Sequence, residues 1–316
     1  MKAAFVFPGQ GSQSVGMMGS FEKLPAVRQT FEEASGYLGI DLWKLVQEGP
    51  AEKLNETVNT QPVMLVAGVA MYRAWQASSD LRPVSMAGHS LGEYSALVAS
   101  GILKFADAVP LVRFRAQAMQ DAVPAGVGAI AAIIGLDDDA IRAVCREASA
   151  GAEQVEAANF NSPAQVVIAG HKVAVERGME LAKTKGAKRA MLLPMSVPSH
   201  CALMRPAAMQ LKNRLAQIAL HVGSIPVLHN ADVAAAATED KVKDALVRQL
   251  YQPVRWVETV RTLVAAGATH IVECGPGKVL AGVNKRIVPD AKILTFGDAT
   301  NFEEALASFK GDRIES

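Results

Sequence analysis

A serine lies between two glycines in the segment Gly-His-Ser-Leu-Gly at residues 88–92. The apolar residues 83–87 before it predict a strand, and residues 93–99 after it predict a helix. A sharp turn from a strand into a helix can expose a serine hydroxyl, and flanking glycines permit the close backbone approach that such a turn needs. The segment therefore predicts a nucleophile, Ser90, and an oxyanion-binding N–H on Leu91. An ordinary tight turn is the other interpretation, because short glycine-serine patterns recur by chance.

A serine nucleophile needs a base that takes its proton. Of the six histidines, His200 follows an irregular segment with two prolines, residues 194–199, and precedes a predicted helix from about Ala202. This position favours His200 as the base, although a histidine bonded locally at a helix entry would give the same pattern. His89 lies inside the predicted turn and cannot easily fold back onto Ser90, so we expect it to form a wall of the site.

The group that orients the base is usually a carboxylate. The candidates after the histidine are Asp232, Glu239, Asp240 and Asp244, which fall in a polar, alanine-rich stretch. That composition is more typical of a solvent-exposed helical face than of an active site. A backbone carbonyl or an amide could take the place of the acid.

A glycine-rich loop follows the first predicted strand, which covers residues 3–7. It does not match a phosphate-binding Gly-x-Gly-x-x-Gly pattern, because Ser14 stands where the third glycine is needed. Lipases and esterases draw a second oxyanion donor from a loop of this kind. We therefore expect an N–H of this loop to complete an oxyanion hole with that of Leu91.

The elements that would position these residues indicate an α/β fold. Short apolar strands alternate with longer helical patterns through most of the chain, which is typical of a parallel sheet covered by helices. The middle reads β-α-β-β-α-β, with strands near 129–134, 155–158, 165–169 and 188–194, which is the pattern of a small four-stranded unit. We predict a large α/β domain over residues 1–124 and 196–316, a small subdomain over 125–195, and a site in the cleft between them.

Composition excludes several classes of protein. The formal net charge is +1 and no run of basic residues occurs, so nothing indicates a nucleic-acid-binding protein. The three cysteines are far apart and odd in number, which favours a reducing, cytoplasmic setting without disulfides. We expect no membrane span and no secretory signal, since no apolar run approaches about 20 residues. No histidine, cysteine and carboxylate spacing resembles a zinc site.

Five motifs occur in a fixed order: Phe-Pro-Gly-Gln-Gly-Ser-Gln at 7–13, Gly-His-Ser-Leu-Gly-Glu-Tyr at 88–94, Asn-Ser-Pro at 161–163, Val-Pro-Ser-His at 197–200 and Gly-Pro-Gly at 275–277. In these motifs and their spacing the chain closely resembles the malonyl-CoA:acyl carrier protein transacylases, the stand-alone acyltransferases of type II fatty acid synthesis. The resemblance extends from Phe5 to about Ala281. It implies an α/β-hydrolase-like large domain and an inserted ferredoxin-like subdomain, in agreement with the pattern of elements.

The resemblance also implies roles for individual residues. Ser90 and His200 would form a dyad, with main-chain carbonyls in place of the usual acid and Gln249, before Leu-Tyr, supplying the neighbouring one. Arg115 would bind the malonyl carboxylate, and the glycine that usually follows this arginine is replaced by alanine here. The N–H groups of Gln10 and Leu91 would hold the oxyanion. His89, Gln249 and Asn161 are the further substrate-binding residues that the resemblance suggests.

The resemblance implies transfer of a malonyl group from malonyl-CoA to the phosphopantetheine thiol of acyl carrier protein, with no metal or other cofactor and with a monomeric enzyme. A serine esterase or thioesterase, a trans-acting polyketide acyltransferase and a non-catalytic carrier-docking module are the alternatives. A basic cluster, Lys183, Lys185, Lys188 and Arg189, is the candidate docking surface for the carrier, although a solvent-exposed face of a helix has the same composition.

Overall fold

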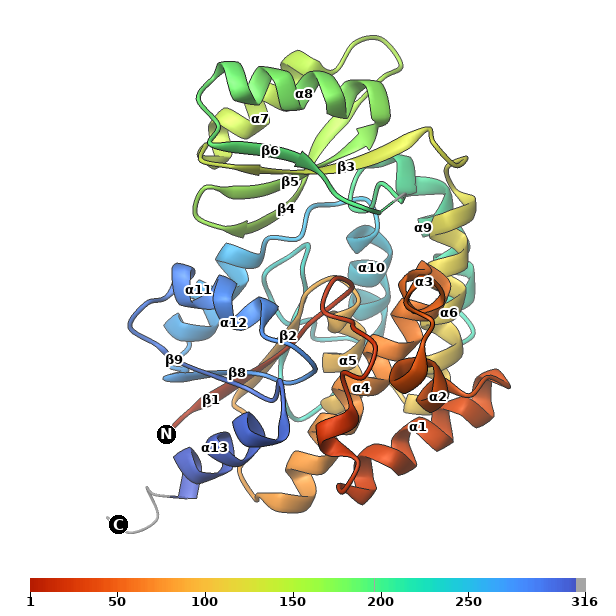
Figure 1. Cartoon of the computed structure of the whole chain (residues 1–316), viewed down its shortest axis with the longest axis vertical. Helices are drawn as coiled ribbons and strands as arrows, with labels where there is room; N and C mark the ends of the chain where they lie inside the picture. Colours follow the sequence, from red (N-terminus) through yellow and green to blue (C-terminus); the bar gives the residue numbers. More distant parts are fainter. Residues whose placement is uncertain (196, 311–316) are drawn as a thin grey trace.

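A five-stranded parallel sheet forms the centre of the larger body, with the strand order β7-β2-β1-β8-β9 (Figure 1). The computed structural model describes residues 1–195 and 197–310. The strands of this sheet are β1 (Ala3–Phe7), β2 (Ser85–Gly88), β7 (Val227–Leu228), β8 (His270–Glu273) and β9 (Lys292–Thr295).

The central strand β1 is buried along its whole length, because helices cover both faces of the sheet. Its alternate side chains enter two separate cores, as the two-residue period of a strand requires. Ala3, Phe5 and Phe7 pack with α1, α4, α5 and α6, whereas Ala4 and Val6 pack with α11 and α12. Because both faces of this strand are buried, its sequence is apolar at every position.

The helices of the larger body come from both ends of the chain (Figure 1). Within the described residues, none of the helices is both long enough and apolar enough to cross a membrane. They are η1 (Gly19–Phe21), α1 (Pro25–Leu38), α2 (Leu42–Glu48), α3 (Ala51–Asn55), α4 (Thr57–Ser78), α5 (Gly92–Ala99), α6 (Phe105–Asp121), η2 (Ala202–Met204), α9 (Arg205–Leu215), α10 (Glu239–Gln249), α11 (Trp256–Ala265), α12 (Val279–Ile287) and α13 (Ala299–Lys310).

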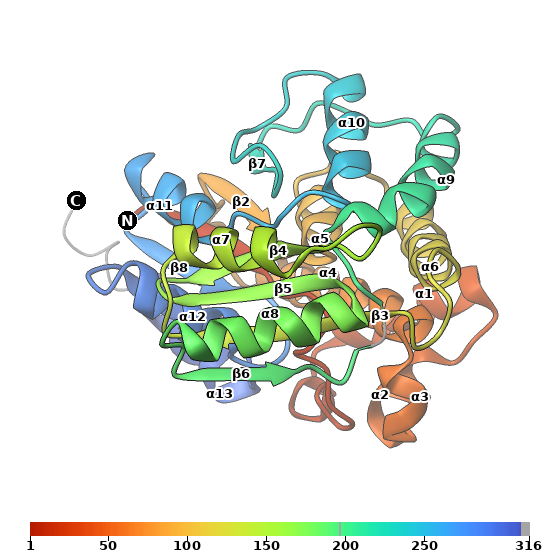
Figure 2. The ribbon, with the colours of Figure 1, turned by 90° about the horizontal axis from the view of Figure 1, so that it is seen from above.

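The smaller body is a four-stranded antiparallel sheet with the order β4-β5-β3-β6, covered on one face by two helices. Figure 2 shows α7 and α8 lying across these strands, and Figure 1 shows the opposite face of the sheet turned toward the larger body. The order matches a ferredoxin-like unit, which confirms the predicted β-α-β-β-α-β pattern. Its elements are β3 (Gly128–Ile134), α7 (Asp138–Ala148), β4 (Val155–Ser162), β5 (Gln165–His171), α8 (Lys172–Thr184) and β6 (Arg189–Leu192).

The boundaries of several elements differ from the predicted ones. Strand β4 continues four residues beyond the predicted end because it accommodates two irregularities, at 157/159 and 160/162. Strand β6 ends at Leu192, two residues before the predicted end. The predicted domain boundaries at 124/125 and 195/196 stay a prediction, and residues 196 and 311–316 of the predicted large domain lie outside the described residues.

Candidate functional site

Ser90 occupies a strained turn between β2 and α5, as the sequence predicts. Its φ of 51° lies in the left-handed region that a residue with a side chain rarely adopts. The flanking glycines are required, since a Cβ on Gly88 would lie 1.9 Å from the carbonyl carbon of Gly92, and one on Gly92 would lie 2.0 Å from the oxygen of Phe7. The turn therefore packs directly against the end of β1 and leaves the Ser90 side chain in the cavity.

His200 is bonded to the serine and to the main chain behind it. Its Nε2 lies 2.8 Å from Ser90 Oγ, and its Nδ1 lies 2.7 Å from the carbonyl oxygen of Gln249. A carbonyl oxygen only accepts, so Nδ1 carries the proton and Nε2 accepts the serine hydroxyl. His200 also has a positive φ, 63°, which its own N–H supports by donating to the Leu250 oxygen at 2.9 Å.

The environment keeps this imidazole neutral. Burial, followed by the charge of Arg115, lowers the pKa of His200 to about 3, while the main-chain oxygens of Gln249 and Gln252 act in the opposite direction. A neutral imidazole at physiological pH can accept a proton from the serine hydroxyl. The pair is thus arranged as a nucleophile and its base.

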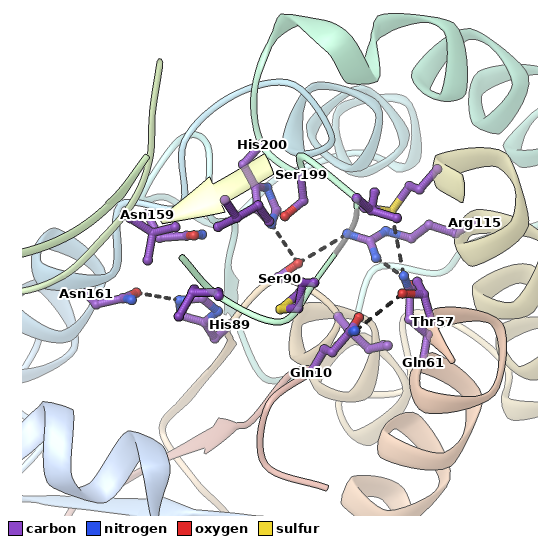
Figure 3. A pocket seen from close by; sticks show the side chains of 17 residues that line it. Gln10, Thr57, Gln61, His89, Ser90, Arg115, Asn159, Asn161, Ser199 and His200 are labelled. Atoms are coloured by element: carbon purple, nitrogen blue, oxygen red, sulfur yellow. Dashed lines mark hydrogen bonds between the residues drawn. The ribbon is translucent and has the colours of Figure 1, made fainter. Parts of the chain in front are cut away.

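Arg115, on α6, brings a buried cation to the nucleophile (Figure 3). One guanidinium nitrogen, Nη2, donates to Ser90 Oγ at 3.3 Å and to the side-chain oxygen of Gln249 at 2.9 Å. The other, Nη1, donates to Gln61 Oε1 at 2.7 Å. Burial lowers the pKa of Arg115, whereas Tyr94 and Glu93 raise it. Its Nε has no hydrogen-bond partner among the described residues, and a buried cation with a spare donor is suited to an anionic ligand.

The glycine-rich loop after β1 lies against the serine turn. A Cβ on Gly9 would lie 2.5 Å from the oxygen of His89 and 3.6 Å from the nitrogen of Leu91, so only glycine permits this approach. Gln10 and Leu91 consequently line the same cavity as Ser90, and the Gln10 side chain donates to Thr57 at 3.4 Å. This proximity is what a two-donor oxyanion hole requires.

The cavity has a volume of about 150 Å³ and two unlike walls. The large-body wall carries the polar and reactive groups Gln10, Thr57, Gln61, His89, Ser90, Arg115 and His200, together with the apolar side chains of Leu91 and Met119. The small-sheet wall comes from the smaller body and the segment after β6, and is mainly apolar: Ile130, Asn159, Asn161, Val167, Leu193 and Met195. Val197 and Ser199 complete the lining.

The two walls meet where His89 Nε2 lies 2.8 Å from the side-chain oxygen of Asn161 (Figure 3). His89 lines the cavity, as expected, and Asn161 lies beside it. Gln249 does not line the cavity. Its side chain is buried behind Ser90 and Arg115 and contacts protein groups, so we expect it to act on the substrate indirectly.

The carboxylates that follow His200 in sequence do not orient it. Asp232 and Asp244 both pair with Arg248 at the surface, in agreement with the solvent-exposed interpretation. Cys201 is buried and donates its Sγ–H to the Pro198 oxygen at 3.1 Å, so it is a structural thiol. Within residues 1–195 and 197–310, no group of three or more histidine, cysteine, aspartate and glutamate side chains is arranged to hold a metal ion.

Three polar residues that support the reacting groups were missed by sequence reasoning. Asn230 accepts the Ser90 N–H at 2.7 Å, Glu93 lies buried beneath the turn, and Gln61 holds Arg115. Glu93 carried a usable signal, because a charged residue in an otherwise apolar helical turn needs buried partners. Asn230 follows the end of a parallel strand, a position typical of site residues, but the two-residue strand β7 is too short to recognise.

Comparison with known proteins adds independent information. A model of the acyl transferase domain family matches residues 4–294. The chain is 57% identical to the malonyl CoA-acyl carrier protein transacylase of Escherichia coli (strain K12) over 286 residues, which cover 90% of this chain and 92% of that relative.

Two solved structures superpose closely on this chain. An acyl-carrier-protein S-malonyltransferase from Burkholderia pseudomallei 1710b superposes with a TM-score of 0.95 at 57% identity, covering 97% of this chain and 100% of the other. A malonyl-transacylase in complex with a type II PKS acyl-carrier protein superposes with a TM-score of 0.96 at 50% identity, covering 98% and 100%.

Proposed function

Because the chain belongs to the malonyl CoA-acyl carrier protein transacylase family of acyl transferases, we propose that it moves a malonyl group from malonyl-CoA to the phosphopantetheine thiol of acyl carrier protein. The observation that carries this proposal is the buried guanidinium of Arg115, 3.3 Å from the Ser90 hydroxyl. Malonyl has a free carboxylate at the end remote from the thioester. A cation at this position binds that carboxylate while the thioester carbonyl lies against the nucleophile.

In the first half-reaction, Ser90 Oγ attacks the thioester carbonyl and His200 Nε2 takes the hydroxyl proton. The oxyanion that forms is held by the N–H groups of Gln10 and Leu91. The carbon–sulfur bond then breaks, the proton on His200 passes to the departing CoA sulfur, and a malonyl-Ser90 ester remains.

In the second half-reaction, the phosphopantetheine thiol of the carrier protein gives its proton to His200 and its sulfur attacks the malonyl ester. The carbon–oxygen bond breaks and the proton returns to Ser90 Oγ. The main-chain oxygen of Gln249 keeps the proton on His200 Nδ1 in both directions, so that Nε2 faces the reacting atoms. All of these steps use side chains and main-chain groups of the protein and its two substrates, and we propose that no resident cofactor takes part.

The proposal extends to the setting of the protein. Every group that the two half-reactions use comes from one chain, so we propose a monomeric enzyme. The three cysteines are free and buried, as suits a reducing compartment, and we propose a cytoplasmic location.

Mass spectrometry of the protein after incubation with malonyl-CoA tests the proposed function. We expect a persistent malonyl adduct on Ser90 that disappears when the pantetheinylated carrier protein is added. The matched control, Ser90→Ala, should carry no adduct. Rapid release of free malonate without carrier would identify a hydrolase instead, and the absence of any adduct would identify a carrier-binding module.

A further inference from the structure

Glu93 is a buried carboxylate in the first turn of α5, three residues after the nucleophile. It is not exposed and does not line the cavity. Its Oε1 lies 2.7 Å from Nδ1 of His229, and its Oε2 accepts from the Asn230 main-chain N–H at 2.9 Å and from Gln249 Nε2 at 2.8 Å. Burying a carboxylate is costly unless hydrogen bonds replace water. Here three groups from distant parts of the chain converge on it.

The contact between Glu93 and Asn230 leads to the nucleophile. The side chain of Asn230 spans the serine turn: its Oδ1 accepts from Ser90 N–H at 2.7 Å, and its Nδ2 donates to the Gly88 oxygen at 2.7 Å. A left-handed conformation at a residue with a side chain is energetically unfavourable. The Asn230 amide helps to hold Ser90 in that conformation, and Glu93 fixes the backbone of Asn230.

The contact between Glu93 and Gln249 leads to the base and to the cation. Gln249 Nε2 donates to Glu93 and to the Ser90 oxygen at 3.0 Å, so both of its amide hydrogens have acceptors and the amide has one orientation. That orientation turns Oε1 toward Arg115 Nη2. The main-chain oxygen of the same residue accepts from His200. Gln249 therefore fixes the base and the cation together, and Glu93 fixes Gln249.

We propose that Glu93 is a positioning residue for acyl transfer, holding the nucleophile through Asn230, and the base and the carboxylate-binding arginine through Gln249. This inference rests on the proposed function, since it concerns the same reaction. Glu93 does not line the cavity, and its hydrogen bonds are to His229, Asn230 and Gln249. In a Ser-His-acid triad the acid contacts the histidine directly. Here the Glu93 carboxylate holds Gln249, and the main-chain oxygen of Gln249 orients the imidazole.

Two substitutions distinguish positioning from a purely electrostatic role as a countercharge for Arg115. Glu93→Gln keeps the side-chain length and removes the charge. Its oxygen can still accept from Asn230 and Gln249, and its amide can donate to His229 when that ring carries its proton on Nε2. Glu93→Asp keeps the charge and withdraws the carboxylate by about one carbon–carbon bond, roughly 1.5 Å, which breaks hydrogen bonds of this length.

The rate at which a fluorophosphonate labels Ser90 is the primary measurement, because such probes react with activated serines whatever acyl group the enzyme uses. Malonyl loading, the kcat and KM for malonyl-CoA, and the melting temperature accompany it. We expect Glu93→Asp to lower both the labelling rate and kcat by about 10²-fold with a smaller change in KM, as displacement of reacting groups by about 1 Å does. Glu93→Gln should stay within about tenfold of wild type because its hydrogen bonds persist.

Glu273→Gln is the matched control. Glu273 is also fully buried at the end of a central strand, and it accepts from the N–H groups of Leu280 and Ala281 at 3.0 and 2.7 Å. Glu273 does not line the cavity, and the two N–H groups that it accepts belong to α12. We expect this variant to melt at a lower temperature and to label at the wild-type rate.

Four results would overturn the proposal. Two concern activity at Glu93: Glu93→Asp is at least as active as Glu93→Gln, or both variants are labelled at the wild-type rate. The other two are a loss of labelling in Glu273→Gln equal to that in Glu93→Asp, and failure of both Glu93 variants to fold, which would make Glu93 a stability residue. A wild-type protein that is labelled but not malonylated would refute the proposed function and leave the comparison at Glu93 interpretable.

Discussion

The two walls of the cavity are built on different principles. On the large-body wall, hydrogen bonds to other protein groups hold each reactive residue in place. The main-chain N–H of Ser90 and the ring of His200 each have one such bond, to an amide side chain and to a carbonyl oxygen, and Arg115 donates to two amide side chains. On the small-sheet wall, Ile130 and Val167 present alkyl groups that make no directional contact. The difference separates two tasks, because one wall fixes where the reaction occurs and the other sets the space that an acyl group has.

The comparison has a consequence for mutation. Changes to the dyad on the large-body wall remove reacting groups and should affect the rate with every substrate, whereas changes to Arg115 on the same wall should affect only substrates that carry a carboxylate. Changes on the small-sheet wall alter shape and should affect the choice between substrates. Substitutions on each wall test this division.

Removal of either member of the dyad should have the largest effect. We expect Ser90→Ala and His200→Ala each to lower malonyl transfer by about 10⁴-fold or more, since the covalent step loses its nucleophile or its base. Steady-state transfer to the carrier protein measures the loss, and circular dichroism establishes that the variants are folded. Transfer by either variant at a rate near that of wild type would remove the residue from the proposed mechanism.

Arg115 should have the next largest effect, and a selective one. A buried guanidinium that meets a carboxylate contributes about 2–4 kcal/mol, so Arg115→Ala should lower malonyl transfer by about 10²-fold and spare acetyl transfer. Arg115→Lys should recover part of the loss, because an ammonium cannot make two parallel hydrogen bonds. The quantity to measure is the ratio of kcat/KM for malonyl-CoA to that for acetyl-CoA. An unchanged ratio in Arg115→Ala would make this arginine structural.

The pH dependence tests the electrostatics of the same wall. Since the pKa of His200 is lowered to about 3, the loading rate should show no inflection near 6.5. Arg115→Ala removes a charge that lowers this pKa, so its profile should begin to fall at a higher pH than that of wild type. The unfolded histidine takes up a proton near pH 6.5 and the folded one does not, so the stability that neutral His200 contributes is lost as pH falls from about 6.5 toward 3. A wild-type inflection at 6.5 would contradict the neutral, buried base.

On the small-sheet wall, Val167→Ala should change selectivity. The two missing methyl groups enlarge the cavity beside the acyl group, and we expect kcat/KM for methylmalonyl-CoA to rise about tenfold relative to malonyl-CoA. Competition between the two thioesters measures this ratio directly. An equal loss with both substrates would show that this wall also positions the reacting groups.

The smallest effect should come from outside both walls. Near the end of α8, Lys183 pairs with Glu180 and Lys185 pairs with Glu147. Such ion pairs also agree with the alternative interpretation of these lysines, a solvent-exposed face of a helix. If the carrier protein docks here, charge reversal should raise its KM about threefold and leave malonyl loading unchanged, because exposed charges contribute little each. Lys44→Glu on α2 is the control. Equal changes in both half-reactions would exclude this docking surface.

The sequence predicts the parts of the fold and site that depend on local pattern. The turn at Ser90 follows from glycine spacing, and the inserted β-α-β-β-α-β unit follows from alternation of elements. Strands β7 and β9 were not predicted, since β7 has only two residues and β9 is a partly exposed edge strand that begins with a lysine. The partnership of Glu93 with Asn230 and Gln249 joins residues more than 130 positions apart, and no local pattern reports such a contact.

The central place of β1 bears on how the protein is synthesised. Strand β1 leaves the ribosome before both of its partners, because it pairs with β2, about eighty residues later, and with β8, whose first residue is His270. Until β8 has emerged, one edge of β1 has no strand to pair with. The Gly9–Gln10 loop then follows a strand that is paired on one side only. Pairing over such separations is slow and leaves a strand edge open to other chains. We therefore expect this edge of β1 to stay open until β8 has been translated.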